Sequence, residues 1–160
     1  MSSQYTYIFT VLASTEGFLV VSGLILLSLL LRRNFRAAGL FLLTTIGAAV
    51  STQLLKEYFM VARPENAPVQ AAGYAFPSGH AMGAMYLALF AAYAASVFTK
   101  PIRYGFYLLA AGFALGIGMS RLQLGVLTPV QVFAGYAVAV FWVGVYIFCV
   151  DASGIIPSCL

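Results

Sequence analysis

The sequence predicts an all-α integral membrane protein, a bundle of about five transmembrane helices in a single membrane domain over residues 1–160. Hydrophobic residues make up 62% of the chain and charged residues 8%, whereas a soluble domain carries about 25% charged residues. A chain this short would need a polar surface to be soluble, so lipid is the expected solvent. Two further observations support this class: long apolar runs, and basic residues gathered in the connections between them.

Five apolar runs are candidates for membrane spans, because a helix needs about 20 residues to cross a bilayer. The fourth run reaches that length only if its helix extends toward Leu122. The third is rich in alanine and glycine, which let neighbouring helices approach closely, so we expect it at the centre of the bundle. The predicted spans are Tyr7–Leu31, Ala37–Leu55, His80–Phe98, Tyr104–Met119 and Pro129–Val150.

The basic residues predict the orientation of the bundle. Two short connections, after the first and the third span, lie on the same side of the membrane and hold five of the eight lysines and arginines. Basic loops are typically cytoplasmic, so we expect a multi-pass protein of the cell membrane (plasma or inner) with its N-terminus outside and its C-terminus inside. The net charge of +4 then needs no nucleic acid partner. The five residues are Arg32, Arg33, Arg36, Lys100 and Arg103.

The other three basic residues, Lys56, Arg63 and Arg121, fall on the outer side, against this charge rule. Lys56 and Arg63 are seven residues apart and would share one helix face, roughly 10 Å apart, if the second span extended that far. Pro64 disfavours helix at the preceding residue, so we expect the helix to end at Arg63. Arg121 ends the fourth span, where its planar guanidinium suits bidentate binding of a phosphate.

A turn-forming segment, Phe76-Pro77-Ser78-Gly79-His80, directly precedes the third span. Ser78 is a typical N-cap residue, and the free N–H groups of Gly79 and His80 at a helix N-terminus favour an anion. His80, the only histidine in the sequence, can donate a hydrogen bond or a proton near neutral pH. With three cations on the same side, this segment predicts a phosphate site at the outer membrane surface. The alternative is that Lys56 and Arg121 are interfacial anchors and that His80 is structural.

At these positions the chain resembles the type 2 phosphatidic acid phosphatase family, which includes lipid phosphate phosphatases and vanadium haloperoxidases. Lys56 and, after six residues, Arg63-Pro64 match its first motif, Pro77-Ser78-Gly79-His80 matches its second, and Ser120-Arg121 opens its third. The resemblance covers Lys56 to Tyr136, so the family-like core is expected at residues 56–136. It implies that the general-acid position is His80 and that phosphoryl oxygens are bound by Lys56, Arg63, Ser78, Gly79, His80 and Arg121.

The third motif lacks the two residues that carry the chemistry of the family. After the arginine, the family has five residues, a nucleophilic histidine, three residues and an aspartate that orients it; here Leu127 and Gln131 stand at those two positions. Loss of a nucleophile commonly lowers the rate by several orders of magnitude. The resemblance therefore implies a pseudophosphatase, a carrier, sensor or complex subunit for a phosphorylated lipid of the polyprenyl phosphate, phosphatidic acid or lipid A type.

Two alternatives stay open. One is an active lipid phosphate or pyrophosphate phosphatase in which His80, Thr128 or a water replaces the missing nucleophile, because electrostatic stabilisation is often the largest catalytic term. The other is a scaffold whose site binds nothing. No cofactor is expected, and no metal, because one histidine and four unclustered carboxylates make no coordination set.

Bacterial membrane members of the family typically have six spans, and the third of these ends at the first motif. Here the second span ends there, so one N-terminal helix is expected to be missing, and a protein partner or a second copy of the chain could cover the exposed flank. Glu16, in the first span, has two interpretations. It faces such a partner or a cavity, as a carboxylate in lipid usually does, or it lies shallow enough to reach the headgroups.

Overall fold

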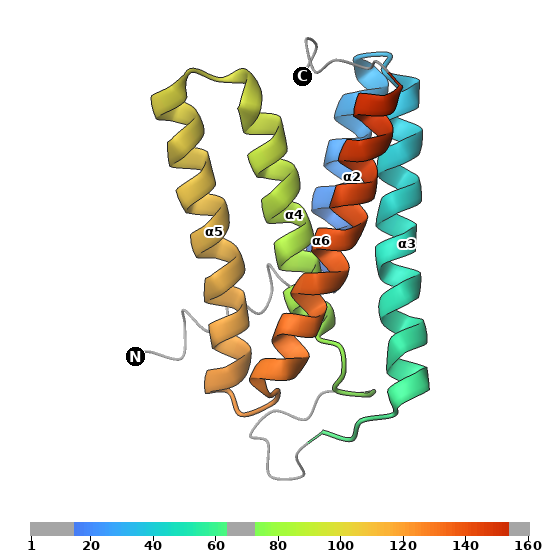
Figure 1. Ribbon diagram of the computed structural model, residues 1–160, viewed down its shortest axis with the longest axis vertical. Helices are drawn as coiled ribbons and strands as arrows, with labels where there is room; N and C mark the ends of the chain where they lie inside the picture. Colours follow the sequence, from blue (N-terminus) through green and yellow to red (C-terminus); the bar gives the residue numbers. More distant parts are fainter. Residues whose placement is uncertain (1–14, 64–72, 154–160) are drawn as a thin grey trace.

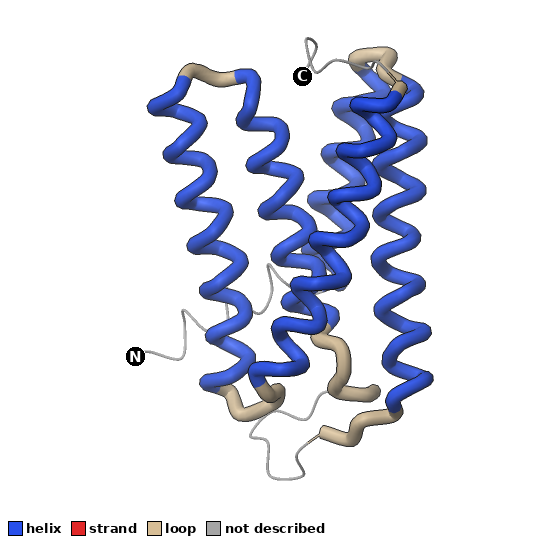
Figure 2. The backbone as a smooth tube through the Cα atoms, viewed as in Figure 1, coloured by secondary structure: helices blue, strands red, loops and turns tan. Residues whose placement is uncertain are grey.

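The structure, a computed structural model, describes residues 15–63 and 73–153 (Figure 1). Within these ranges the regular secondary structure is entirely helical, which confirms the predicted all-α class (Figure 2). The elements are α2 (Thr15–Leu31), α3 (Phe35–Phe59), α4 (Gly79–Ala94), the short 3₁₀ helix η1 (Ala95–Val97), α5 (Lys100–Gln123) and α6 (Pro129–Ala152).

Four of the described helices are long and apolar enough to cross a membrane: α3, α4 continued by η1, α5 and α6. The apolar helix α2 has 17 described residues, and the part of the predicted first span before Thr15 lies outside the described residues. α5 is longer than predicted at both ends, since it begins at Lys100 and continues past Met119 to Gln123. Pro101 occupies a first-turn position, where a helix tolerates proline.

α4 is the central helix, as its small residues predict. It contacts α2, α3, α5 and α6, most extensively α5 and α6, and Figure 1 shows it between α5 and the remaining helices. At Gly83 the ring of Phe18 from α2 lies 3.2 Å from the place where a β-carbon would stand. A larger residue there would push α2 away, so the small residue sets how closely these two helices pack.

Aromatic side chains fill the core between α3, α4 and α6. The ring of Phe90 packs edge-on against Phe41, with centroids 4.8 Å apart, and against Tyr146 at 4.7 Å. The hydroxyl groups of Tyr86 and Thr44 are hydrogen-bonded at 2.9 Å, as expected in lipid, where buried polar groups must find partners within the protein. This core fixes the middle of the bundle, and the polar residues discussed below lie at one end of it.

The connections alternate between the two ends of the bundle (Figure 1). α2 connects to α3, and α4 to α5, at the end drawn at the top, whereas α3 leads to α4, and α5 to α6, at the end drawn at the bottom. The five basic residues of the short connections therefore lie at the first end, and Lys56, Arg63 and Arg121 lie at the second. This separation into two groups is as predicted. The assignment of the first end to the cytoplasm stays a prediction.

The end of α3 corrects one expectation. The helix ends at Phe59, well before Arg63, because Met60 adopts left-handed backbone (φ 45°, ψ 35°) and its N–H bonds to the carbonyl oxygen of Lys56 at 3.0 Å. The expectation that the helix ends at Arg63 is therefore wrong. Since the chain leaves the helix after Phe59, Lys56 and Arg63 do not share a helix face, and Arg63 lies at the same end of the bundle in a segment without regular secondary structure.

Glu16 lies in the first turn of α2, and its side chain is exposed. Phe18 packs against Gly83 in the second turn of α4, so the first turn of α2 is level with the beginning of α4. This position fits the interpretation in which Glu16 lies near the headgroups. A partner subunit that covers this flank stays a prediction.

Candidate functional site

The turn before α4 is held by hydrogen bonds on both sides of Ser78. As predicted, Ser78 is the N-cap of α4, because its Oγ accepts a hydrogen bond from the Ala81 N–H at 3.2 Å. Its own N–H donates to the carbonyl oxygen of Gln131 in α6 at 3.0 Å. The residue is 2% exposed, so Ser78 serves first to fix the turn, and the donor that these bonds leave for a ligand is its hydroxyl proton.

Lys56 approaches the N-terminus of α4 from α3. Its Nζ lies 3.8 Å from the place where a β-carbon of Gly79 would stand, so the ammonium group lies directly beside the first turn of α4. Glycine at this position leaves room for a ligand between the ammonium and the backbone N–H groups of Gly79 and His80. Both kinds of group attract an anion, and the helix dipole adds to this attraction.

Arg63 is placed by two contacts between the ends of the loop that joins α3 to α4. The Ala75 N–H donates to the Val61 carbonyl oxygen at 2.8 Å, and the Nε of Arg63 donates to the Gly73 carbonyl oxygen at 3.0 Å. The other four N–H donors of the guanidinium are on its terminal nitrogens. Partial burial lowers the pKa of Arg63 from its ordinary value, because desolvation disfavours the charged form.

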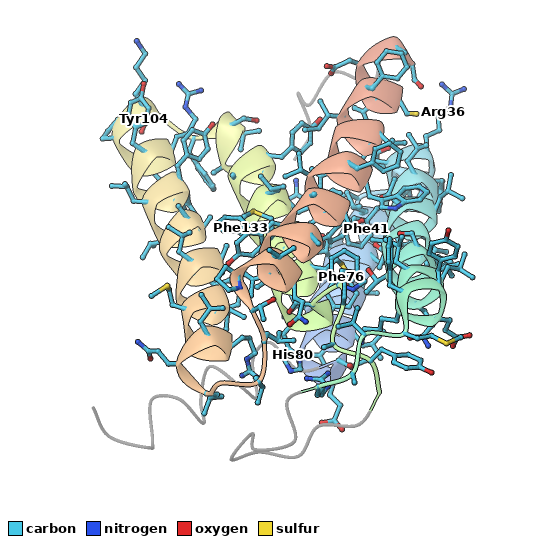
Figure 3. The ribbon with its side chains drawn as sticks, turned by 60° about the horizontal axis from the view of Figure 1, so that its bottom comes forward. Arg36, Phe41, Phe76, His80, Tyr104 and Phe133 are labelled. Carbon is cyan, nitrogen blue, oxygen red and sulfur yellow. The ribbon has the colours of Figure 1, made fainter. Side chains whose placement is uncertain are left out.

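The three cations gather around His80, although they come from three different segments. Arg121, Arg63 and Lys56 all interact electrostatically with His80, and Arg63 also interacts with each of the other two. Arg121, in the last turn of α5, is buried at 7% exposure. Figure 3 turns this end of the molecule forward and labels His80 at the beginning of α4. A bound anion would relieve the repulsion among these like charges.

The structure thus brings together all six residues that the sequence proposed for phosphate binding, at the end of the bundle where α4 begins. The electrostatic interactions just described link four of them, Lys56, Arg63, His80 and Arg121, in one cluster. Ser78 and Gly79 belong to it through the N-terminus of α4 and the approach of the Lys56 ammonium.

Leu127, at the position of the missing nucleophile, is part of a small hydrophobic cluster. It is 8% exposed and lies in the connection from α5, directly before Thr128, the N-cap residue of α6. Its neighbours come from the segment before α4, from α4 and from α6, so an apolar layer lies under the turn that carries His80. The buried members of this cluster are Ala75, Ala81, Val126, Leu127, Val132 and Tyr136.

Gln131, at the position of the orienting aspartate, has taken a structural role. Its side-chain Oε1 accepts a hydrogen bond from the N–H of Thr128, the N-cap residue of α6, at 2.8 Å. Through its backbone carbonyl it also holds Ser78. This cap was not predicted from the sequence, although Thr128-Pro129-Val130-Gln131 fits the capping-box pattern of a Ser or Thr followed three residues later by Glu or Gln.

Gly135 was also missed, and it determines how closely α6 approaches the turn. A β-carbon here would collide with the Ser78 carbonyl oxygen and would stand 3.1 Å from the Met82 nitrogen and 3.2 Å from the Ala81 Cβ. One residue on, the Tyr136 hydroxyl donates to the Ala114 carbonyl oxygen of α5 at 2.6 Å. The beginning of α6 is therefore attached to α4 and α5, two of the three helices that carry site residues.

The donor set of the site suits an anion. It consists of an ammonium group, two guanidinium groups, an imidazole and the N–H groups of a helix N-terminus. Across residues 15–63 and 73–153 there is no group of three or more His, Cys, Asp or Glu side chains that could hold a metal ion. The residues present at the site therefore do not fit a resident metal, whereas they do fit the oxygens of a phosphate.

Comparisons with known proteins agree with the motifs. A family model described as the PAP2 superfamily matches residues 37–155. A crystal structure described as the first transmembrane PAP2 type phosphatidylglycerolphosphate phosphatase, from Bacillus subtilis, superimposes with a TM-score of 0.77 at 22% sequence identity. The alignment covers 95% of this chain and 79% of that one. No curated protein gave a significant match.

The structural similarity at this level of identity shows a shared fold. The family match extends from the first residues of α3 to the end of α6 and includes each segment that contributes to the cluster around His80. Since it spans most of the chain, the protein belongs to the PAP2 superfamily, the type 2 phosphatidic acid phosphatases to which its motifs point.

Proposed function

We propose that this protein binds the phosphate of a phosphorylated lipid at one membrane surface and does not cleave it by the phosphohistidine route of its family. One observation carries the proposal: three cations and a helix N-terminus gather around His80, while the nucleophile position holds Leu127, packed in an apolar cluster. The proposed role is that of a carrier, a sensor or a complex subunit for a lipid of the polyprenyl phosphate, phosphatidic acid or lipid A type. The proposed side is the outer face of the cell membrane.

The roles of the individual residues follow from their chemistry. The ammonium of Lys56, the guanidinium groups of Arg63 and Arg121, and the N–H groups of Gly79 and His80 would hold the non-bridging oxygens. The Ser78 hydroxyl would add one further donor. The imidazole of His80 would lie beside the bridging oxygen to the lipid, where a general acid would act. Attack on phosphorus needs a nucleophile on the opposite side, and leucine offers neither a lone pair nor a site for a proton.

An active phosphatase with a different nucleophile is the second candidate. The observation that favours it is the same cluster of cations, because positive groups around a phosphoryl group stabilise the charge of the transition state. Thr128 is exposed at the N-terminus of α6, yet a hydroxyl needs an adjacent base to attack. The neighbour that contacts its backbone is the neutral amide of Gln131, which cannot accept the proton.

Binding and release of phosphate by the purified protein separate these candidates. The unmodified protein is expected to bind a short-chain phosphatidic acid and to release no inorganic phosphate from it above background. The double variant Leu127→His, Gln131→Asp restores the family's pair and is expected to gain activity, whereas each single variant is the matched control. Release of phosphate by the unmodified protein that disappears in His80→Ala would refute the proposal in favour of the second candidate.

The scaffold alternative has its own test in the same assay. Replacing Arg63 and Arg121 together by alanine removes the two guanidinium groups nearest to His80 and is expected to abolish binding of the lipid phosphate. Binding that is unchanged in this double variant, or absent from the unmodified protein, would leave the site without a ligand and would refute the proposal.

A further inference from the structure

A group of exposed apolar side chains lies at the end of α3, on the side of the segment that leads to His80. Phe59 is 49% and Met60 is 61% exposed, and the half-buried Phe76 comes from the segment before α4. The rings of Phe59 and Phe76 pack edge-on, with centroids 4.9 Å apart and an interplanar angle of 74°. We call Phe59, Met60 and Phe76 the apolar shelf.

The apolar shelf shares two segments with the cation cluster, the end of α3 and the chain around the beginning of α4. Phe59 follows Lys56 by three residues, so the two are neighbours on the surface of α3, and Phe76 precedes Ser78 by two residues. The last turn of α3 therefore makes two contacts with the chain around the beginning of α4. One is apolar, Phe59 with Phe76, and the other places the Lys56 ammonium beside Gly79.

This arrangement is more than the aromatic belt that membrane proteins carry at their interfaces. Aromatic residues of such a belt project separately into the headgroup region. Here the two rings are packed on each other, and the chain around them is fixed by the left-handed cap at Met60 and by the Val61–Ala75 hydrogen bond. A rigid apolar surface of this kind costs little entropy when a ligand settles on it.

We propose that the apolar shelf binds the first part of the hydrocarbon chain of a lipid whose phosphate is held by the cation cluster, so that the protein selects lipid phosphates over water-soluble ones. The proposal rests on the proposed phosphate binding. Its basis is the continuity of a cationic and an apolar surface, which matches one ligand class: an amphiphile with an anionic head and an apolar tail. Free phosphate or glycerol phosphate matches only the cationic part.

The test compares two ligands that share the phosphate and differ in the chain, dioctanoyl phosphatidic acid and glycerol phosphate, on the protein in nanodiscs of neutral lipid. Phe59→Ala is expected to weaken the binding of dioctanoyl phosphatidic acid about tenfold, the order expected for loss of one apolar contact surface, and to leave glycerol phosphate unchanged. Phe76→Ala is expected to act in the same way. The matched control is Phe133→Ala, because Phe133 is an aromatic residue of α6 that is 67% exposed (Figure 3). This variant is expected to leave the binding of both ligands unchanged.

Each further outcome decides between the two proposals. Unchanged binding of dioctanoyl phosphatidic acid in both shelf variants means that the rings are an interfacial belt, and it overturns the shelf. Equal weakening of both ligands means that the variants disturb the cation cluster, and it overturns the shelf as well. If the unmodified protein binds neither ligand, phosphate binding itself fails. If binding of both ligands is lost in Arg63→Ala and is unchanged in both Phe variants, phosphate binding stands and the shelf is overturned.

Discussion

Replacing Gly135 by alanine tests whether the close approach of α6 to the turn positions the site. The new methyl group would collide with the Ser78 carbonyl oxygen, which is backbone and cannot turn aside as a flexible side chain would. Overpacking of this kind typically costs about 1–3 kcal/mol. A shift of α6 that relieves it would lengthen the bond from the Ser78 N–H to the Gln131 carbonyl oxygen, 3.0 Å in the native chain, which is worth about 1 kcal/mol.

Gly144 provides the matched control, because it lies in the same helix and a β-carbon there would meet nothing within 4 Å. Gly144→Ala is expected to be neutral or to stabilise by up to about 1 kcal/mol through helix propensity. The assay is thermal unfolding of both variants in one detergent, together with binding of dioctanoyl phosphatidic acid. We expect a lower Tm and weaker binding for Gly135→Ala alone. Equal Tm values and equal binding for the two variants would refute the positioning role of Gly135.

Two further predictions concern the cap of α6 and the charge of the ligand. Gln131→Ala removes the acceptor of the Thr128 N–H and should lower the free energy of unfolding by about 1 kcal/mol. Gln131→Glu keeps an acceptor and should leave the Tm unchanged. An equal loss of stability in both variants would contradict the role of this side chain as a cap. Burial lowers the pKa of Arg63 from its ordinary 12.5, and because this group is a base it loses its charge only as the pH rises through that lowered pKa. If Arg63 is still charged at neutral pH, lipid phosphate binding should strengthen as the pH rises through about 6, where a phosphate monoester loses its second proton. A binding titration from acid to neutral pH checks this, and weakening over that range would show that loss of charge on the protein dominates.

The sequence predicted the helices and the residues of the site, because both follow from patterns of neighbouring residues in the chain. Apolar runs of membrane length predicted the spans α3, α4, α5 and α6, and the alanine-rich third run predicted the central position of α4. Ser78 was predicted as N-cap from residue type and position alone, and the hydrogen bond to Ala81 confirms it. Alternation of the helices between the two membrane faces was enough to place Lys56, Arg63 and Arg121 at one end.

The features that the sequence did not predict depend on contacts between distant segments. Pro64 correctly excluded helix at Arg63, but the earlier end of α3 depends on the left-handed cap at Met60, and nothing in the side chain of methionine favours that backbone. The close approach at Gly135 depends on a partner more than fifty residues away in the chain, as the contact with Ser78 shows. A single glycine among apolar residues carries no sign of which backbone atom will lie against it.

Under the proposed function, Leu127 and Gln131 account for a site that keeps its geometry without the phosphohistidine chemistry of the family. A histidine and an aspartate at positions 127 and 131 would place polar groups next to the apolar cluster under the turn, and such groups need hydrogen-bond partners to be stable there. Leu127 instead adds to that cluster, and Gln131 caps α6 while its carbonyl holds Ser78. Both residues now support the turn from which Gly79 and His80 face the cations. Selection for phosphate binding alone would keep this support, whereas selection for turnover would not tolerate the loss of the nucleophile.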